Sequence, residues 1–252
     1  MKVWTRLVFI LCFSLLLPVV LRAAGEGTTV RYASGSETVE GYLVTPAGAG
    51  PFPAVVVIHE WWGLNDQVRE EARKLAAEGY VALAVDLYRS RVAGNPEEAH
   101  ELSRGLPEDR ARRDLRAAFA YLAERPDVRR DRIGSLGWCM GGGYSLRLAL
   151  DEPRLAAAVI YYGRLVTDEA ELAQLKTPLL GLFGEDDRGI PAESVRAFEA
   201  ALKKLGKPAY ITLYAGAGHA FANAMRPSYR KEASEDAGKK TLAFLAENLK
   251  KK

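Results

Sequence analysis

Short, continuous apolar runs alternate along this chain with longer amphipathic stretches. Residues 54–58 and 80–85 are apolar at almost every position, which is typical of strands buried on both faces of a parallel sheet. Residues 28–33 and 38–45 instead alternate apolar with polar, around the turn-like segment Ser34-Gly35-Ser36. Further strands are predicted at 132–138, 155–162, 178–183 and 209–214.

The amphipathic stretches between these runs predict helices. Asn65 can cap a helix that runs to about Glu78, and Gly79 would end it. Its apolar positions share one face: Val68, Ala72, Leu75 and Ala76. A second helix is predicted to start near Pro107, and others are predicted at 140–150, 191–205 and 229–250. Strands that alternate with helices predict an α/β fold with a mostly parallel central sheet covered on both faces.

The first 25 residues have the pattern of a secretory signal peptide. Lys2 and Arg6 precede an apolar stretch at 7–21, and the small residues Ala23 and Gly25 suit a cleavage site after Gly25. An uncleaved membrane anchor is the alternative, although the apolar run is short for a membrane span. We therefore expect an exported, periplasmic or extracellular protein whose single domain comprises residues 26–252.

Removal of this segment changes how charge and cysteine content are interpreted. The formal net charge is +3 for the whole chain, and it falls to zero without Lys2, Arg6 and Arg22. The basic character therefore gives no support for nucleic-acid binding. Cys139 becomes the only cysteine, which excludes an internal disulfide. Because there is no clustered His/Cys set and no Gly-x-Gly-x-x-Gly after a first strand, no metal or organic cofactor is expected.

The segment Gly137-Trp138-Cys139-Met140-Gly141 has the form of a nucleophile elbow, with cysteine in place of the usual serine. It stands between a predicted strand and a predicted helix. A sharp turn there strains the backbone, so the neighbours two positions away must be nearly free of side chain, as Gly137 and Gly141 are. A thiol at the first turn of a helix also experiences the positive end of the helix dipole, which favours the thiolate. The segment predicts covalent catalysis.

A cysteine nucleophile needs a base and a group that orients the base. Asp187 follows the predicted strand 178–183, and His219 follows the predicted strand 209–214. The order nucleophile, acid, histidine is that of α/β-hydrolases, and all three residues stand at carboxyl ends of predicted strands. Taken singly, Asp187 could merely shape a turn, and His219 could satisfy loop backbone. Asp186 competes for the acid role from one residue away.

The other two histidines are weaker candidates for the base. His100 stands in a charged stretch and is expected at the solvated surface. His59 precedes Glu60 at a strand end, where it could support the site without being the base.

Five segments together resemble the dienelactone hydrolase family, and the resemblance covers nearly all of the chain after residue 25. They are His59-Glu60-Trp61-Trp62-Gly63-Leu64-Asn65, Asp86-Leu87-Tyr88, Gly137-Trp138-Cys139-Met140-Gly141-Gly142, the turn around Asp187, and Gly218-His219-Ala220-Phe221. The resemblance implies an α/β-hydrolase fold with a Cys-His-Asp triad. In that family the acid stands four residues before a proline, as Asp187 stands before Pro191, and this spacing favours Asp187 over Asp186.

The resemblance also implies supporting roles around the nucleophile. Glu60 resembles the family's strand-end glutamate, which interacts with the cysteine and helps to generate the thiolate when substrate binds. The alternative is that Glu60 is an ordinary loop carboxylate. The backbone N–H groups of Trp61 and Met140 would form the oxyanion hole.

The chain departs from the family where the substrate is held. In the family's namesake enzymes, arginines hold a substrate carboxylate, and one of them stands four residues after the catalytic histidine, where this chain has Asn223. A neutral amide gives up the charge-assisted, bidentate contact. The second arginine is expected just after Tyr88, where the chain offers Arg89 and Arg91. We therefore hypothesise an ester or lactone substrate without the family's carboxylate requirement.

The residues expected to contact substrate are Tyr88, Arg89, Trp138, Phe221 and Asn223. Trp61 and Trp62 would extend an aromatic pocket wall, although aromatic residues are more often plain core.

These observations predict an exported hydrolase of carboxylic esters or lactones that acts through an acyl-enzyme, as a monomer or weak oligomer, on a small-molecule substrate. A thioesterase or acyltransferase would use the same triad. A binding protein on a hydrolase scaffold, or a sensor that uses the Cys139 thiol, are alternatives from other classes. After signal cleavage, neither nucleic acid nor membrane is an expected partner.

Overall fold

The computed structural model describes residues 25–251, so the predicted signal peptide lies almost entirely outside the described residues. Its centre is an eight-stranded sheet with the strand order β1-β2-β4-β3-β5-β6-β7-β8. The pairs β1/β2 and β2/β4 are antiparallel, and every pair from β4 to β8 is parallel. The strands are β1 (Thr28–Ser34), β2 (Glu37–Val44), β3 (Phe52–Ile58), β4 (Val81–Val85), β5 (Val128–Trp138), β6 (Ala157–Tyr161), β7 (Leu179–Gly184) and β8 (Ala209–Tyr214).

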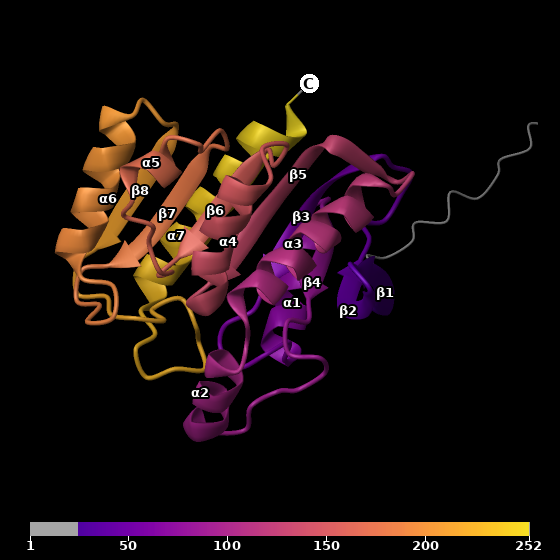
Figure 1. The fold of residues 1–252 in the computed structure, drawn as a ribbon, viewed down its shortest axis with the longest axis horizontal. Coiled ribbons are helices and arrows are strands. Elements are labelled where there is room, and N and C mark those ends of the chain that lie inside the picture. The colour runs from indigo at the N-terminus through magenta and orange to yellow at the C-terminus, as the bar shows by residue number, and fades with distance from the viewer. Residues whose placement is uncertain (1–24, 252) are drawn as a thin grey trace, which may run out of the picture.

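Helices cover both faces of the sheet (Figure 1). They are α1 (Asp66–Ala77), α2 (Pro96–Arg104), α3 (Glu108–Ala123), α4 (Met140–Asp151), α5 (Glu169–Leu172), α6 (Ala192–Lys204) and α7 (Lys231–Leu245), which continues into a π-helical turn at Ala246–Lys250. Helices α3, α4 and α6 pack on one face, and α1 and α7 pack on the other. The prediction of a mostly parallel sheet covered on both faces is confirmed.

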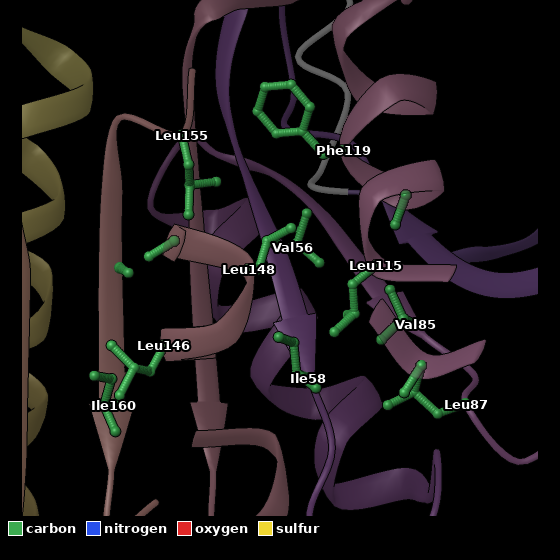
Figure 2. Packing of buried hydrophobic residues seen from close by; sticks show 14 of the residues in the cluster. Val56, Ile58, Val85, Leu87, Leu115, Phe119, Leu146, Leu148, Leu155 and Ile160 are labelled. Atoms are coloured by element: carbon green, nitrogen blue, oxygen red, sulfur yellow. The ribbon is translucent and has the colours of Figure 1, made fainter. Parts of the chain in front are cut away.

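The buried strands divide their side chains between two cores because successive residues of a strand point to opposite faces. Val56 and Ile58 of β3 join Leu115 and Phe119 of α3 in the larger core, as Figure 2 shows. Val55 and Val57 belong to the second core, which includes the buried residues of α1 and α7. The continuous apolar run of β3 is therefore required by burial on both faces.

Local signals explain where α1 begins and ends. The Asn65 side chain accepts a hydrogen bond from the Val68 N–H at 3.2 Å, which caps the first turn. Gly79, with φ of 87°, follows the last turn in the left-handed region that glycine adopts freely. Both features agree with the prediction for this helix.

The apolar periodicity of the sequence does not predict α2. Its Asn95 side chain accepts from the Glu98 N–H at 2.9 Å, and Pro96 occupies the first turn. Only Ala99 and Leu102 of this helix are buried, so the apolar stripe is too narrow to stand out from the polar stretch around it. Among residues 25–251, no helix combines the length and the apolar character needed to cross a membrane.

Candidate active site

A sharp turn between β5 and α4 presents Cys139 at the carboxyl end of the sheet. Cys139 has φ of 52° and ψ of −118°, a strained conformation for a residue with a side chain. Its N–H donates to the Tyr161 carbonyl at 3.0 Å, which ties the turn to β6. A Cβ on Gly137 would lie 2.1 Å from the Gly141 carbonyl oxygen, and a Cβ on Gly141 would lie 2.3 Å from the Ile58 carbonyl oxygen. The turn is thus closed tightly enough that only glycine fits at both positions.

The structure brings Cys139 together with the two residues predicted to assist it. The Nε2 of His219 lies 3.1 Å from the Cys139 Sγ, and the Nδ1 of His219 lies 2.8 Å from the Asp187 Oδ2. The other carboxylate oxygen of Asp187 accepts from the N–H groups of Gly189 and Ile190, at 2.8 and 3.0 Å. Asp187 is therefore fixed by its own loop and in turn fixes the ring of His219.

The contacts of His219 with Asp187 and Cys139 favour the protonated form of its imidazole. Burial acts to lower the pKa of His219, but the hydrogen bonds and charges of Asp187 and Cys139 outweigh it and raise the pKa to about 10. For Asp187, burial acts to raise the pKa, and contact with His219 and two backbone N–H groups holds it below its ordinary value. Near neutral pH, His219 therefore carries a proton next to the sulfur.

A pocket of about 410 Å³ opens beside the Cys139 sulfur, a size suited to a small molecule. Its lining includes Glu60, Trp61, Trp62, Cys139, His219 and Arg226. Glu60 is 6% exposed, and burial raises the pKa of its carboxyl group, against the opposing effects of Asn223, His219, Arg226 and Tyr162. A buried carboxyl group with a raised pKa is suited to accept and release a proton.

Trp61 and Met140 approach Cys139 from two different elements. Trp61 follows the end of β3, and Met140 is the first residue of α4, so its N–H has no acceptor within the helix. The contact between Gly141 and the Ile58 backbone holds the start of α4 against the end of β3. That these two N–H groups form an oxyanion hole stays a prediction.

The remaining two histidines support the surroundings of the pocket. His59 is fully buried, its Nε2 accepts from the Leu87 N–H at 3.3 Å, and its Nδ1 lies 2.5 Å from the Glu60 carbonyl oxygen. Burial lowers its pKa, so a neutral ring joins the ends of β3 and β4. His100 is exposed, and its ring packs edge-on against Trp61 at 4.7 Å between ring centroids.

The structure does not bring Arg89 to the pocket. Its guanidinium lies 2.7 Å from a Glu37 oxygen and 2.8 Å from an Asp114 oxygen, and Asp114 is buried. Two carboxylates thus hold this cation between β2 and α3. Arg91 is also not part of the pocket lining. The prediction that Arg89 contacts substrate is corrected accordingly.

Asn223 also lies elsewhere than predicted. It is 1% exposed, and its Nδ2 donates to the Glu60 Oε2 at 2.7 Å. The amide is therefore engaged with the Glu60 carboxylate, a strong charge-assisted acceptor, and it is not part of the pocket lining.

The three aromatic residues expected at the substrate are also outside the pocket lining. Phe221 is fully buried against Tyr162 and Tyr214. Tyr88 is 4% exposed, with its hydroxyl 3.2 Å from the Met140 sulfur. Trp138 lines a larger adjoining groove that shares Trp62, Pro96 and Arg226 with the pocket. Except for Trp138, these aromatic residues are core.

Sequence reasoning missed two residues of the site. Arg226 lines the pocket, and its guanidinium lies 3.7 Å from the centre of the Trp62 ring, a cation–π contact. Tyr162 directs its hydroxyl at the Glu60 Oε1, at 3.4 Å, and its ring packs on His219. Arg226 stands seven residues after His219, outside the motif, and Tyr162 is one of several aromatic residues at a strand end. No local signal distinguished either of them.

Cys139 follows β5, Asp187 follows β7 and His219 follows β8, and these are the places that α/β-hydrolases give to nucleophile, acid and histidine. The protein is an α/β-hydrolase by fold. Residues 39–249 match the sequence model of the dienelactone hydrolase family, which covers well over half of the chain. The chain belongs to this family, and it is an enzyme of the ester and lactone hydrolase class.

Individual relatives agree with this assignment. A candidate carboxymethylenebutenolidase of Methylorubrum extorquens is 34% identical over 231 residues, which span 86% of this chain and 78% of the relative. A crystal structure of a candidate dienelactone hydrolase from Klebsiella pneumoniae has a TM-score of 0.80 at 31% identity, with 87% of this chain and 98% of that chain covered. A dienelactone hydrolase-like promiscuous phosphotriesterase from metagenomic libraries has a TM-score of 0.81 at 25% identity, covering 88% and 98%.

Proposed function

We propose that this protein is an exported hydrolase that cleaves small carboxylic esters or lactones through an acyl-enzyme on Cys139. The observation that carries the proposal is the continuous contact from the Cys139 Sγ to the His219 ring, at 3.1 Å, and from that ring to Asp187, at 2.8 Å. Nucleophile, base and orienting acid within hydrogen-bond reach are what nucleophilic acyl transfer requires.

The reaction proceeds in two halves. In the first, the Cys139 thiolate attacks the carbonyl carbon, and the N–H groups of Trp61 and Met140 stabilise the oxyanion. The bond to the leaving oxygen breaks, and protonated His219 delivers its proton to that oxygen. Asp187 holds the imidazole in place throughout. Glu60 lies in the same pocket and is the group that could accept the proton of Cys139 whenever the sulfur is protonated.

In the second half, a water molecule attacks the thioester. Neutral His219 takes a proton from this water, the carbon–sulfur bond breaks, and the carboxylic acid product leaves Cys139 as a thiolate. The thiolate again faces protonated His219, so the pair returns to its starting state.

The charges around the pocket bear on which substrate fits. Arg89 and Asn223, the residues at the expected carboxylate-binding positions, are engaged with Asp114 and Glu60 respectively. This supports our hypothesis of a substrate that does not need a carboxylate. Arg226 is the arginine in the pocket lining, and it would have to supply the contact if an acidic substrate were preferred.

The test is hydrolysis of a panel of neutral p-nitrophenyl esters, neutral lactones and acidic lactones, with Cys139→Ala as the comparison. We expect turnover that disappears in Cys139→Ala, with similar kcat/KM for acidic and neutral lactones. Turnover that survives in Cys139→Ala would refute the nucleophile. A strong preference for acidic lactones would refute the hypothesis of a substrate without a carboxylate and would indicate Arg226 as the group that binds the carboxylate.

Thioesters and an alternative acyl acceptor belong on the same panel, because a thioesterase or acyltransferase would use the same three residues. A binding protein on this scaffold would bind a lactone without turning it over. A thiol sensor would react at Cys139 but would not need His219 or Asp187.

Export is tested separately. The sequence of residues 1–25 predicts a secretory signal with cleavage after Gly25. Fractionation of the producing cell and the mass of the recovered protein would show whether the segment is removed. Recovery of the full-length chain from the cytoplasm would contradict export.

A further inference from the structure

Asn223 is placed to control the charge of Glu60. Its amide Nδ2 donates to the Glu60 Oε2 at 2.7 Å, and both residues are almost completely buried. An ionised carboxyl group offers only acceptors, so an amide donor at this distance favours the carboxylate over the carboxylic acid. Buried contacts of this kind count for more than exposed ones because water does not compete for the donor.

The orientation of the Asn223 amide is fixed from its other side. Its Oδ1 accepts from the Met225 N–H at 2.9 Å, so the NH₂ group must face Glu60. The backbone is held as well, because the Asn223 N–H donates to the Ala220 carbonyl and the Asn223 carbonyl accepts from the Arg226 N–H, both at 3.0 Å. The donor therefore belongs to a folded loop that follows His219 directly.

Other polar groups also surround Glu60, and three of them, Asn65, Gln67 and Glu71, line a small cavity of about 10 Å³ with it. The Tyr162 hydroxyl lies 3.4 Å from the Oε1, and His219, Arg226 and Cys139 share the pocket with Glu60. The contact from Asn223 is the shorter of the two hydrogen bonds to this carboxyl group within residues 25–251. Burial favours the protonated acid, and Asn223 opposes it.

We propose, resting on the proposed function, that Asn223 is a positioning residue that keeps Glu60 in its carboxylate form and directed at the pocket of Cys139. Because the amide is engaged with Glu60 and is not part of the pocket lining, it acts through this carboxylate and does not touch the substrate. Whenever the Cys139 sulfur carries a proton beside protonated His219, the Glu60 carboxylate is the remaining group in the pocket that can accept it. This acceptor is lost when Glu60 itself becomes protonated.

The test is the pH dependence of kcat/KM for a neutral p-nitrophenyl ester, measured for the wild type, Asn223→Leu and Asn223→Asp. Without the amide donor, Glu60 binds its proton at higher pH. The acid limb of the profile should then move up by about one pH unit or more. Asn223→Asp keeps an acceptor for the Met225 N–H but sets a second carboxylate against Glu60, so its limb should move in the same direction. KM on the plateau should stay unchanged.

The same substitution in the Glu60→Gln background separates a positioning role from a general structural one. If Asn223 acts through Glu60, Asn223→Leu should cause no further shift of the acid limb there. Asn248→Leu is the matched control, because it removes a 2.8 Å amide contact to the Phe244 carbonyl far from the pocket, and its profile should match the wild type.

An unchanged acid limb in either Asn223 variant would overturn the inference, and so would a shift that persists in Glu60→Gln. A rise in KM without a shift of the acid limb would indicate that Asn223 contacts the substrate, and it would also overturn the inference. If Asn223→Leu fails to fold, Asn223→Asp carries the test. Turnover surviving in Cys139→Ala would instead refute the proposed function, whatever the Asn223 variants do.

Discussion

Gly141→Ala tests whether the tight closure of the elbow is essential. The added Cβ would lie 2.3 Å from the Ile58 carbonyl oxygen and 2.5 Å from the His59 carbonyl oxygen. Both separations are about 1 Å shorter than a comfortable non-bonded contact. Because both neighbours are backbone atoms at the end of β3, no side-chain rotation can relieve the overlap. The start of α4 has to move away from β3.

Two opposing effects decide the size of the change. Alanine gains up to about 1 kcal/mol over glycine in a helix, whereas overpacking costs about 1–3 kcal/mol or more. We expect the overlap to dominate because it involves two rigid backbone groups. A net loss of about 1–2 kcal/mol would lower Tm by about 2–8 °C in a domain of this size. Displacement of Cys139 should also lower kcat/KM by about tenfold or more.

The matched control is Gly238→Ala in α7, where an added Cβ meets no atom within 4 Å. It should raise Tm by about 2 °C through helix propensity alone. Thermal unfolding followed by circular dichroism, together with ester hydrolysis, measures both variants. If Gly141→Ala melts with the wild type and keeps its kcat/KM, the account of the elbow packed against β3 is wrong.

Two further substitutions separate catalysis from stability. Asp187→Asn should lower kcat/KM by about 10³-fold or more. It should also slow iodoacetamide alkylation of Cys139 at mildly acidic pH. Without the Asp187 carboxylate the pKa of His219 falls from about 10, and the thiolate loses its cationic partner. Alkylation at an unchanged rate in this variant would contradict that account. Arg89→Met should lower the free energy of unfolding in urea by about 2–3 kcal/mol, since it leaves the buried Asp114 carboxylate without its closest cation, and KM should not change. A raised KM at unchanged stability would instead put Arg89 at the substrate.

The backbone of the site could be predicted because its signals are local. Gly137 and Gly141 flank Cys139 at the spacing that a strained turn demands, and the nearest atoms to an added Cβ at either position are backbone atoms. Asp187 and His219 follow strands of a parallel sheet, whose carboxyl ends meet at one edge. Position along the chain was therefore enough to bring these groups together.

Side-chain partners could not be predicted in the same way because they come from distant segments. Arg89 stands where a substrate-binding arginine was expected, but its guanidinium forms ion pairs with Glu37 and Asp114. Asp114 lies 25 positions further along the chain. Helix α2 was missed for a related reason, because its two buried residues are too few to form an apolar face in the sequence and are buried only by contact with the larger core. Neither the ion pairs of Arg89 nor the burial of α2 depends on residues close by in the sequence.

Asn223 stands at the position where the family resemblance predicts an arginine, and the charge around Glu60 is arranged accordingly. The family resemblance leads us to expect a cation four residues after His219, and the structure has an amide there, in contact with Glu60. A cation does reach the pocket, but from Arg226, three residues further along the same loop and stacked on Trp62. Glu60 is thus neutralised at longer range by Arg226 and hydrogen-bonded at close range by Asn223. Within residues 25–251 Glu60 forms no salt bridge, which under our proposal leaves its carboxylate free to exchange a proton.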